Sequence, residues 1–457
     1  MFNTSWKRLL LLLASLSWQN DTLYSKTIPV ETFSPPTLQQ ALDDSQPGDE
    51  IRLLAGTYYL DRPLAFPSYR KLIGAGQDQT ILQYQSGQPG VMIDLSGCTG
   101  VELAHFTLEG GSNPKIHQGI SGGKASRLNL HHLTIQNLVK TETFGPHGIL
   151  FSGENPTRNN GVTDSTIADC RFENIGLGSS YGGAIRLAWG SSRNQVLRNT
   201  IRDTGRGGIF GDNGSTDLLI RGNRIAGSGG EGLGIEVWGG CDRAVIEDNQ
   251  LDHWLSVGGC DYCAARRNTV SDKSGPVKYI GLEIIGSYCL VTDNIVDDGQ
   301  QLGISVSDQP QKNYVYWANN TIQNCIQWGA QLQGDSTGIA CHYFYRCQFS
   351  GTTSDRGQPV YPGDAGHGFR LNGNVKHMVF EECRFTHNAR IGIQPGVQPN
   401  VDFLHFLRCT ITDNKGSAVS PLQPYTALLW EDCTVENNGS NDLPPAKPFP
   451  APAPSAS

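Results

Sequence analysis

A short strand-like segment recurs along this chain at a nearly constant interval, and this recurrence restricts the possible folds more than any other feature. One copy is GLGIEVWGG at residues 232–240, in which glycines flank alternating apolar and outward positions. Such alternation over so few residues predicts a β-strand with one buried face. Further copies occupy residues 181–190, 205–214, 279–286, 302–308 and 366–373. A strand that returns at a fixed interval indicates a solenoid.

A second repeated position sets the interval. It is usually Asn or Cys, and an apolar residue follows two positions later. Most steps between these anchors are 24 to 29 residues, with one short step of 19 after Asn249 and long steps of 37 after Leu133 and 36 after Cys347. The anchors are Phe106, Leu133, Cys170, Asn199, Asn223, Asn249, Asn268, Asn294, Asn320, Cys347, Cys383, Cys409 and Cys433. Short strands at this period, without intervening helices, predict an all-β fold, a single-stranded parallel β-helix of about thirteen coils over residues 50–440.

Composition excludes several other classes of protein. Of 457 residues, 17% are charged and 38% hydrophobic, so the chain is neither a disordered nor a membrane-embedded protein. The net charge is −8 and the sequence contains no basic stripe, which argues against a nucleic-acid partner.

The two ends differ from the repeat. Lys7 and Arg8 precede an apolar run at 9–16 that is too short to span a bilayer, so residues 1–25 are predicted to be a signal peptide and the protein to be secreted, periplasmic or at the cell surface, with no transmembrane segment. Residues 26–49 form an N-terminal segment in which 37–45 is expected to be a short helix that caps the first coil. Residues 441–457 are Pro-rich, which predicts a disordered tail.

The anchor position should face inward. Its asparagines are expected to bond the backbone of adjacent coils, because buried amides need partners. Five of the twelve cysteines take the same position and are expected to form a buried ladder of small side chains. Two other pairs, Cys241 with Cys260 and Cys263 with Cys289, have the spacing for disulfides between neighbouring coils.

Outward residues of successive strands should stack into rows on one sheet. Because Ile235 and Val237 are expected inside, Glu236 and Trp238 point out. The first row reads Asp94, Ser121, Leu150, Arg186, Phe210, Glu236, Ser256, Glu283, Ser305, Gln331, Arg370 and Gln394, and the second row includes Ala188, Asp212 and Trp238. The predicted catalytic residues are therefore Glu236, Asp212, Glu283 and Arg186. The predicted substrate-binding residues are Trp238, Trp189, Phe210 and Arg370. Insertions at 152–163 and 351–364 border the same sheet and would make it a groove.

The N-terminal residues carry a family resemblance. The pattern PGDxIxLxxGTY at residues 47–58, followed by IGAG at 73–76, resembles the opening of right-handed β-helix proteins of the pectate-lyase-like superfamily, which includes polysaccharide lyases of the chondroitinase B and alginate lyase group. The resemblance implies a right-handed, extracytoplasmic protein that acts on polysaccharide. It is incomplete: Gly145-Pro146-His147-Gly148 shares only Pro-His with the epimerase motif Asp-Pro-His-Asp, and Glu236 has Trp238 where those lyases carry a second Glu.

Acids, an arginine and aromatic rings on one rigid face suit a sugar polymer. Carboxylates separated by about 6.5–9.5 Å fit inverting glycoside hydrolysis. In a polysaccharide lyase the same acids could hold Ca²⁺, and Arg186 could act as base or carboxylate clamp. We therefore expect a carbohydrate-active enzyme, hydrolase or lyase, with a noncatalytic glycan-binding or structural β-helix as the alternative.

Overall fold

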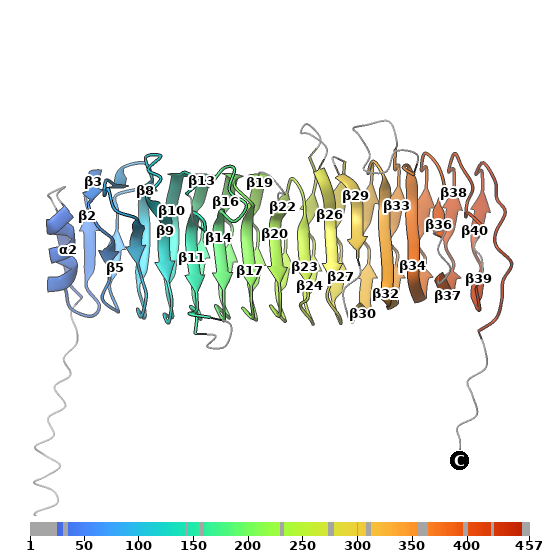
Figure 1. The fold of residues 1–457 in the computed structure, drawn as a ribbon, viewed down its shortest axis with the longest axis horizontal. Helices are drawn as coiled ribbons and strands as arrows, with labels where there is room; N and C mark the ends of the chain where they lie inside the picture. The colour runs from blue at the N-terminus through green and yellow to red at the C-terminus, as the bar shows by residue number, and fades with distance from the viewer. Residues whose placement is uncertain are drawn as a thin grey trace, which may run out of the picture.

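The computed structural model describes residues 25–30, 35–141, 144–155, 160–228, 233–272, 278–298, 300–307, 312–353, 364–395, 401–421 and 425–449. These residues wind into one elongated, right-handed parallel β-solenoid of about 14 turns. Its first and last coils lie at opposite ends of the rod (Figure 1). The predicted fold class is confirmed, and the number of coils is close to the thirteen expected.

Each coil contributes strands to three parallel sheets. The chain runs through the first sheet, then the second and then the third. The first sheet contains β4 (Leu64–Ala65), β7 (Gly90–Asp94), β9 (Ile116–Gly122), β11 (His147–Ser152), β14 (Gly183–Ala188), β17 (Gly207–Asp212), β20 (Leu233–Trp238), β23 (Leu255–Gly258), β26 (Lys278–Ile285), β29 (Gln300–Val306), the first halves of β32 (Trp328–Tyr345) and β34 (His367–Glu381), and β36 (Ile393–Pro395).

The second sheet contains β1 (Thr27–Val30), β2 (Glu50–Leu53), β5 (Lys71–Ile73), the first halves of β8 (Glu102–Glu109) and β10 (Asn129–Leu138), β12 (Thr166–Ala168), β15 (Gln195–Leu197), β18 (Leu219–Arg221), β21 (Val245–Glu247), β24 (Ala264–Arg266), β27 (Leu290–Thr292), β30 (Lys312–Ala318), the last halves of β32 and β34, β37 (Val401–Leu407) and β39 (Leu428–Glu431).

The third sheet contains β3 (Gly56–Leu60), β6 (Thr80–Tyr84), the last halves of β8 and β10, β13 (Arg171–Ile175), β16 (Thr200–Thr204), β19 (Arg224–Ser228), β22 (Gln250–Leu251), β25 (Thr269–Val270), β28 (Ile295–Asp297), β31 (Thr321–Gln323), β33 (Gln348–Ser350), β35 (Arg384–Thr386), β38 (Thr410–Thr412) and β40 (Thr434–Glu436).

The interior is built from stacks of like side chains. Ile209 pairs in register with Ile235, which pairs with Leu255, and all three are fully buried. Towards the C-terminal end the stack becomes aromatic: the rings of Phe380 and Phe406 lie 4.7 Å apart, nearly parallel. Because every coil offers the same inward positions, burial of apolar surface stabilises each coil against its two neighbours.

The asparagine ladder lies inside the solenoid as predicted. Asn199, Asn223, Asn249, Asn268, Asn294 and Asn320 are all buried. The amide of Asn249 donates to Ile220 O (3.0 Å) and to Asn268 Oδ1 (2.9 Å), and its own Oδ1 accepts from the backbone N–H of Asn223 (2.9 Å). Each amide therefore satisfies backbone groups of the neighbouring coils that no strand pairing reaches. A second ladder, Asn388, Asn414 and Asn438, repeats these contacts.

Cysteines continue the ladder where asparagine is missing. Cys170, Cys347, Cys383 and Cys409 are buried at the anchor position, and Cys433 is half-buried in the last coil. All twelve cysteines are free thiols in the structure, including the pairs Cys241 with Cys260 and Cys263 with Cys289 for which disulfides were considered. The backbone N–H of Cys241 instead donates to Cys260 Sγ (3.2 Å).

The corner between the second and third sheets is made by one residue just before each anchor. These residues have positive φ, for example Asp169 (55°), Arg198 (52°), Asp248 (58°) and Arg267 (52°). Their side chains project outward and pair along the rod: Arg198 with Asp169 (2.7 Å) and Arg267 with Asp248 (2.8 Å). This corner does not border the first sheet.

Both ends of the solenoid are covered. Helix α2 (Pro35–Asp44) confirms the predicted cap and places Leu38 and Leu42 in the core. At the other end, residues 441–449 differ from the disorder predicted for the tail: Lys447 forms an antiparallel bridge with Leu428, and Trp430 Nε1 donates to Pro444 O (3.1 Å). The predicted signal peptide lies outside the described residues except for Ser25, as do 156–159 and 354–363 of the two insertions. Among the described residues, no helix is long and apolar enough to cross a membrane.

Candidate active site

The outward row on the first sheet has the predicted register. Arg186 pairs with Phe210, and Phe210 pairs with Glu236. Ser256 separates Glu236 from Glu283, so these two glutamates lie two coils apart. In the second row Asp212 pairs with Trp238. The four charged residues predicted to be catalytic therefore share one face of the five successive strands from β14 to β26.

These residues line one cavity. Its volume is about 430 Å³, within the range of ligand pockets. The lining combines acids, two arginines and aromatic rings. It consists of Tyr181, Arg186, Arg206, Phe210, Asp212, Asn213, Leu233, Glu236, Trp238, Trp254 and Glu283.

Each arginine of the cavity is paired with one acid. Arg186 forms an ion pair with Asp212 in the second row, and the two side chains are only 17% and 15% exposed. Arg206, which precedes β17, holds Glu236 at 3.2 Å through its Nη2, and the Glu236 side chain is 15% exposed. Three carboxyl groups therefore face two guanidinium groups, and each guanidinium group is paired with one of the carboxyl groups.

Glu283 is held differently. Its Oε2 accepts hydrogen bonds from Trp254 Nε1 (3.2 Å) and from Ser256 Oγ (2.7 Å). Trp254 stands just before β23 and contacts Tyr279 edge-to-face, with ring centroids 5.7 Å apart. Two neutral donors thus orient this carboxylate on the adjacent coil.

Burial raises the pKa of Glu236 and of Asp212. It raises the pKa of Glu236 above its ordinary value, and the neighbouring charges of Asp212 and Glu283 add to the increase while Arg206 opposes it. Burial likewise raises the pKa of Asp212, against the opposing effect of Arg186. A carboxyl with a raised pKa keeps its proton at higher pH, which is what a general acid requires.

Aromatic rings form the walls. Phe210 lies over the glycines of β14 and β17, since a Cβ on Gly183 would come within 2.6 Å of its ring. Trp238 lies over Gly258, where a Cβ would be 2.0 Å from the indole, and it remains 36% exposed. Phe144 covers the Arg186 guanidinium at 4.4 Å and contacts Tyr181 at 5.2 Å. Such faces suit the apolar faces of sugar rings.

Two of the residues predicted to bind substrate lie elsewhere. Trp189 occupies the turn after β14 with φ 49° and does not line this cavity. Arg370 lies three coils beyond Glu283 in the same row, where it stacks on Trp328 at 4.3 Å and approaches Asp364 at 3.4 Å. Arg370 therefore lies on the predicted face, but three coils separate it from Glu283, the nearest acid of the cavity in that row.

Asn213 and Leu233 were missed from the sequence, and so were three residues that hold an acid or offer a ring to the cavity: Arg206, Trp254 and Tyr181. All three stand just before a strand, in or beside the glycine-rich turn, so the alternation of the strand says nothing about their direction. The sequence did offer one signal for these residues. Each turn that leads into a strand of the first sheet borders the outward face of that sheet. The turn residues could have been aligned in the same way as the strand residues.

The acids of the cavity are a poor fit for calcium. Asp212 and Glu236 are each engaged by a guanidinium, and Glu283 accepts two hydrogen bonds. They do not belong to any group of three ligand atoms that converge within the described residues. Calcium prefers six to eight oxygen ligands, so calcium has no role in the reaction proposed for this cavity.

Comparison with known proteins establishes the family. The profile described as "right handed beta helix region" matches residues 92–273 and 253–442. The chain therefore belongs to the right-handed β-helix family. A comparison with curated protein sequences finds no significant match.

Several solved structures are similar to this chain at low sequence identity. The catalytic domain of a GH87 α-1,3-glucanase in complex with tetrasaccharides has 14% identity and a TM-score of 0.50, covering 91% of this chain and 69% of that one. A mannuronan C-5 epimerase A-module of Azotobacter vinelandii has 15% identity, a TM-score of 0.43 and coverage of 90% and 95%. An alginate lyase from Paenibacillus has 14% identity, a TM-score of 0.37 and coverage of 77% and 99%.

Proposed function

We propose that this protein is a glycoside hydrolase that cleaves a polysaccharide in the cavity of the first sheet. The observation that carries the proposal is the cavity itself, in which three carboxylates with different environments lie between aromatic walls on a rigid sheet. The similarity to the α-1,3-glucanase shows the fold alone, so the proposal rests on this arrangement.

Glu236 takes the role of general acid. Its raised pKa keeps the proton on the carboxyl up to a higher pH than in an ordinary glutamic acid, and Arg206 Nη2 orients the carboxyl from 3.2 Å. Glu283 takes the role of general base, because two donors orient its Oε2 and leave its other lone pairs for a water. The two residues stand two coils apart, roughly 9–10 Å between Cα atoms. That separation leaves room for a water on the opposite face of the sugar, as inversion requires.

The charge balance favours hydrolysis over β-elimination. A lyase must neutralise the carboxylate of a uronic acid before it removes the neighbouring proton, which needs a free cation. Here the two arginines pair with Asp212 and Glu236, and a third acid remains. Even when Glu236 is protonated as the proposed acid, Asp212 and Glu283 balance the two arginines, so a uronate would meet no excess of positive charge. This supports a neutral sugar at the point of cleavage, and it argues against Arg186 as a base.

The partner we propose is a neutral polysaccharide or oligosaccharide that lies along the first sheet. Trp238 and Tyr181, which are 36% and 54% exposed, offer their rings to sugars on either side of the acids. Such a polymer is met outside the cytoplasm, in agreement with the signal peptide expected at residues 1–25.

The test is release of new reducing ends from a panel of neutral and acidic polysaccharides, with Glu236→Gln as the variant. Loss of the proton donor should lower the rate about 10²- to 10⁴-fold. Glu173→Gln is the matched control, because it makes the same substitution at an exposed position of β13 on the third sheet.

Three results would contradict the proposal. Unsaturated products that absorb in the ultraviolet would identify a lyase. Unchanged activity of Glu236→Gln would remove the assigned acid. Binding of a glycan without cleavage of any polysaccharide would identify the noncatalytic alternative, for which the aromatic walls alone suffice.

A further inference from the structure

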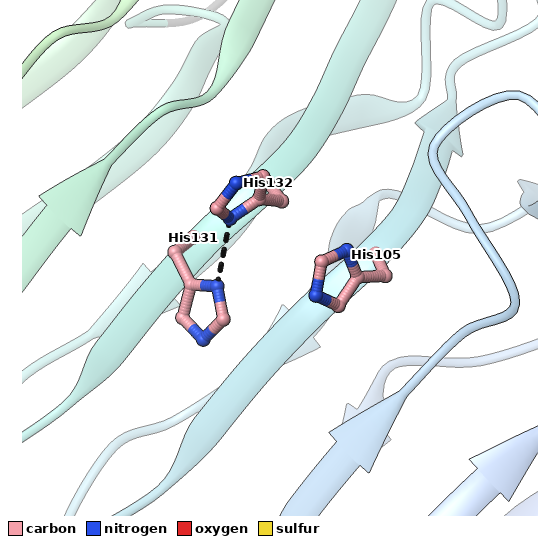
Figure 2. Close-up of side chains that lie close together, drawn as sticks. All are labelled: His105, His131 and His132. Carbon is pink, nitrogen blue, oxygen red and sulfur yellow. Dashed lines mark hydrogen bonds between the residues drawn. The ribbon is translucent and has the colours of Figure 1, made fainter.

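Three histidines gather at the corner between the second and third sheets, away from the cavity. His105 and His132 are the corner residues of β8 and β10, with φ of 61° and 49°. The strand register places His131 beside Ala104, so all three imidazoles project from two adjacent coils (Figure 2). At this corner other coils carry pairs of opposite charge, such as Asp169 with Arg198. The histidines interrupt that pattern.

The nitrogens of these rings converge. One nitrogen from each ring lies within 4.8 Å of the other two. His131 Nδ1 and His132 Nδ1 are only 3.0 Å apart, the contact drawn as a dashed line in Figure 2. Two nitrogens that bind one ion at about 2.0–2.1 Å lie roughly 3 Å apart. The His131–His132 pair therefore already has the separation of two ligands of one metal ion.

A carboxylate fixes the tautomer that metal binding needs. His131 Nε2 lies 3.1 Å from Glu102 Oε1, and Lys71 Nζ holds the other oxygen of Glu102 at 3.1 Å. Because a carboxylate accepts, Nε2 carries the proton and Nδ1 of His131 presents its lone pair towards His132. A histidine whose remote nitrogen donates to a carboxylate is the usual arrangement around a bound metal.

The third ring is suited to join them. His105 stacks on His132 with centroids 4.9 Å apart, so its ring lies beside the pair on the neighbouring coil. His132 is exposed and His105 and His131 are half-buried, so the rings have room to adjust and the site stays open to solvent.

We propose that His105, His131 and His132 bind one divalent transition-metal ion of the zinc or nickel type, with Glu102 as the positioning residue. Imidazole nitrogen suits these ions, whereas calcium and magnesium prefer oxygen ligands. Three nitrogens leave a fourth position for water. The ion would join the coil of β8 to the coil of β10 near the N-terminal end of the rod.

The experiment is calorimetric titration of the full, tag-free chain with ZnCl₂, after removal of metals by chelation. We expect one ion per chain. His132→Gln and the double variant His105→Ala/His131→Ala should each weaken binding at least tenfold, and Glu102→Gln should weaken it about 10- to 100-fold. His387→Ala is the matched control, because His387 is also an exposed residue with positive φ (57°) but lies far along the chain on β35's turn. It should bind zinc as the parent does.

The cysteines require a separate readout, since thiols also bind zinc. Co²⁺ in place of Zn²⁺ should give a spectrum without thiolate charge transfer, and this spectrum should disappear in His132→Gln. The exposed position of His132 makes that variant safe for folding, which circular dichroism checks. Absence of zinc binding, binding unchanged in His132→Gln, or a thiolate band that persists in the variants would each overturn the proposal.

Discussion

At the residue scale, the acidity of Glu236 is set by opposing neighbours. Burial and the acids Asp212 and Glu283 raise its pKa, and Arg206 lowers it. If Glu236 is the proton donor, its pKa determines the alkaline side of the pH–activity profile, because activity falls once the acid has lost its proton. Under the proposed function, Arg206 therefore affects the pH at which activity falls.

The first prediction is that Arg206→Met moves the alkaline limb of the profile to higher pH. Removing the guanidinium removes the charge and the hydrogen bond of Arg206 that lower the pKa of Glu236, so the carboxyl keeps its proton to a higher pH. The pH of the alkaline limb is measured from kcat/KM as a function of pH. Arg202→Met, on the exposed face of β16, should leave the limb in place. A shift to lower pH in Arg206→Met would contradict the assignment of Glu236 as the acid.

The second prediction concerns the asparagine ladder. Asn249→Leu removes the acceptor for the N–H of Asn223 and the donor for Ile220 O, both buried. Leaving these buried groups without a hydrogen-bond partner should lower the free energy of unfolding by about 1–3 kcal/mol. Urea unfolding followed by circular dichroism measures the loss. Gln250→Leu changes the adjacent exposed residue and should have little effect, so equal loss in both variants would show that the ladder is not the cause.

The direction of a side chain was predictable from the sequence only where the residue lies in a strand. The alternation of β20 placed Ile235 inside and Glu236 outside, and the same register brought Asp212, Glu283 and Arg186 to one face. Arg206 and Trp254 stand in turns, whose direction depends on backbone dihedral angles that no periodicity encodes. The pairing of Arg186 with Asp212 also needed side-chain geometry, and the sequence could offer only their proximity.

At the element scale, each strand of the first sheet shapes its neighbour. Trp238 on β20 lies over Gly258 of β23, where a Cβ would come within 2.0 Å of the indole. Gly258, which ends β23, thus lies directly beneath the indole of Trp238 on the preceding coil. The sequence predicted the glycine as a strand end, but its contact with Trp238 follows from the stacking of coils.

The third prediction is that Gly258→Ala weakens glycan binding without altering any aromatic residue. The added methyl must displace the indole, since the backbone of Gly258 lies outside the positive-φ region and the strand has little freedom to move. Calorimetry with an oligosaccharide product of the activity screen should show a loss similar to that of Trp238→Ala. Gly87→Ala adds a methyl where nothing lies within 4 Å and serves as the control. Unchanged affinity in Gly258→Ala would mean that Trp238 does not contact sugar.

At the scale of the whole molecule, a solenoid must protect its two open ends, because each end coil offers unpaired strand edges and apolar core. Helix α2 covers the first coil, as its apolar face in the sequence predicted. The C-terminal cover was not predicted, because its proline content is typical of disorder. Those prolines suit an edge, where a residue without an N–H leaves no donor to pair with another chain. Lys447 supplies the two backbone hydrogen bonds that join it to Leu428, at 2.8 and 2.9 Å.

The last prediction separates this cover from the rest of the tail. Removal of residues 443–457 should expose the edge of β39 and the ring of Trp430, which stacks on Phe406 at 4.3 Å and donates to Pro444 O. We expect faster amide exchange in β39 and β37, and association of molecules through their C-terminal ends, measured by hydrogen exchange and light scattering. Removal of residues 450–457 alone keeps Lys447 and Phe449 and should change neither quantity. If both truncated chains behave like the full chain, residues 443–449 do not protect the end of the solenoid, and the last coil must be stable with its edge open.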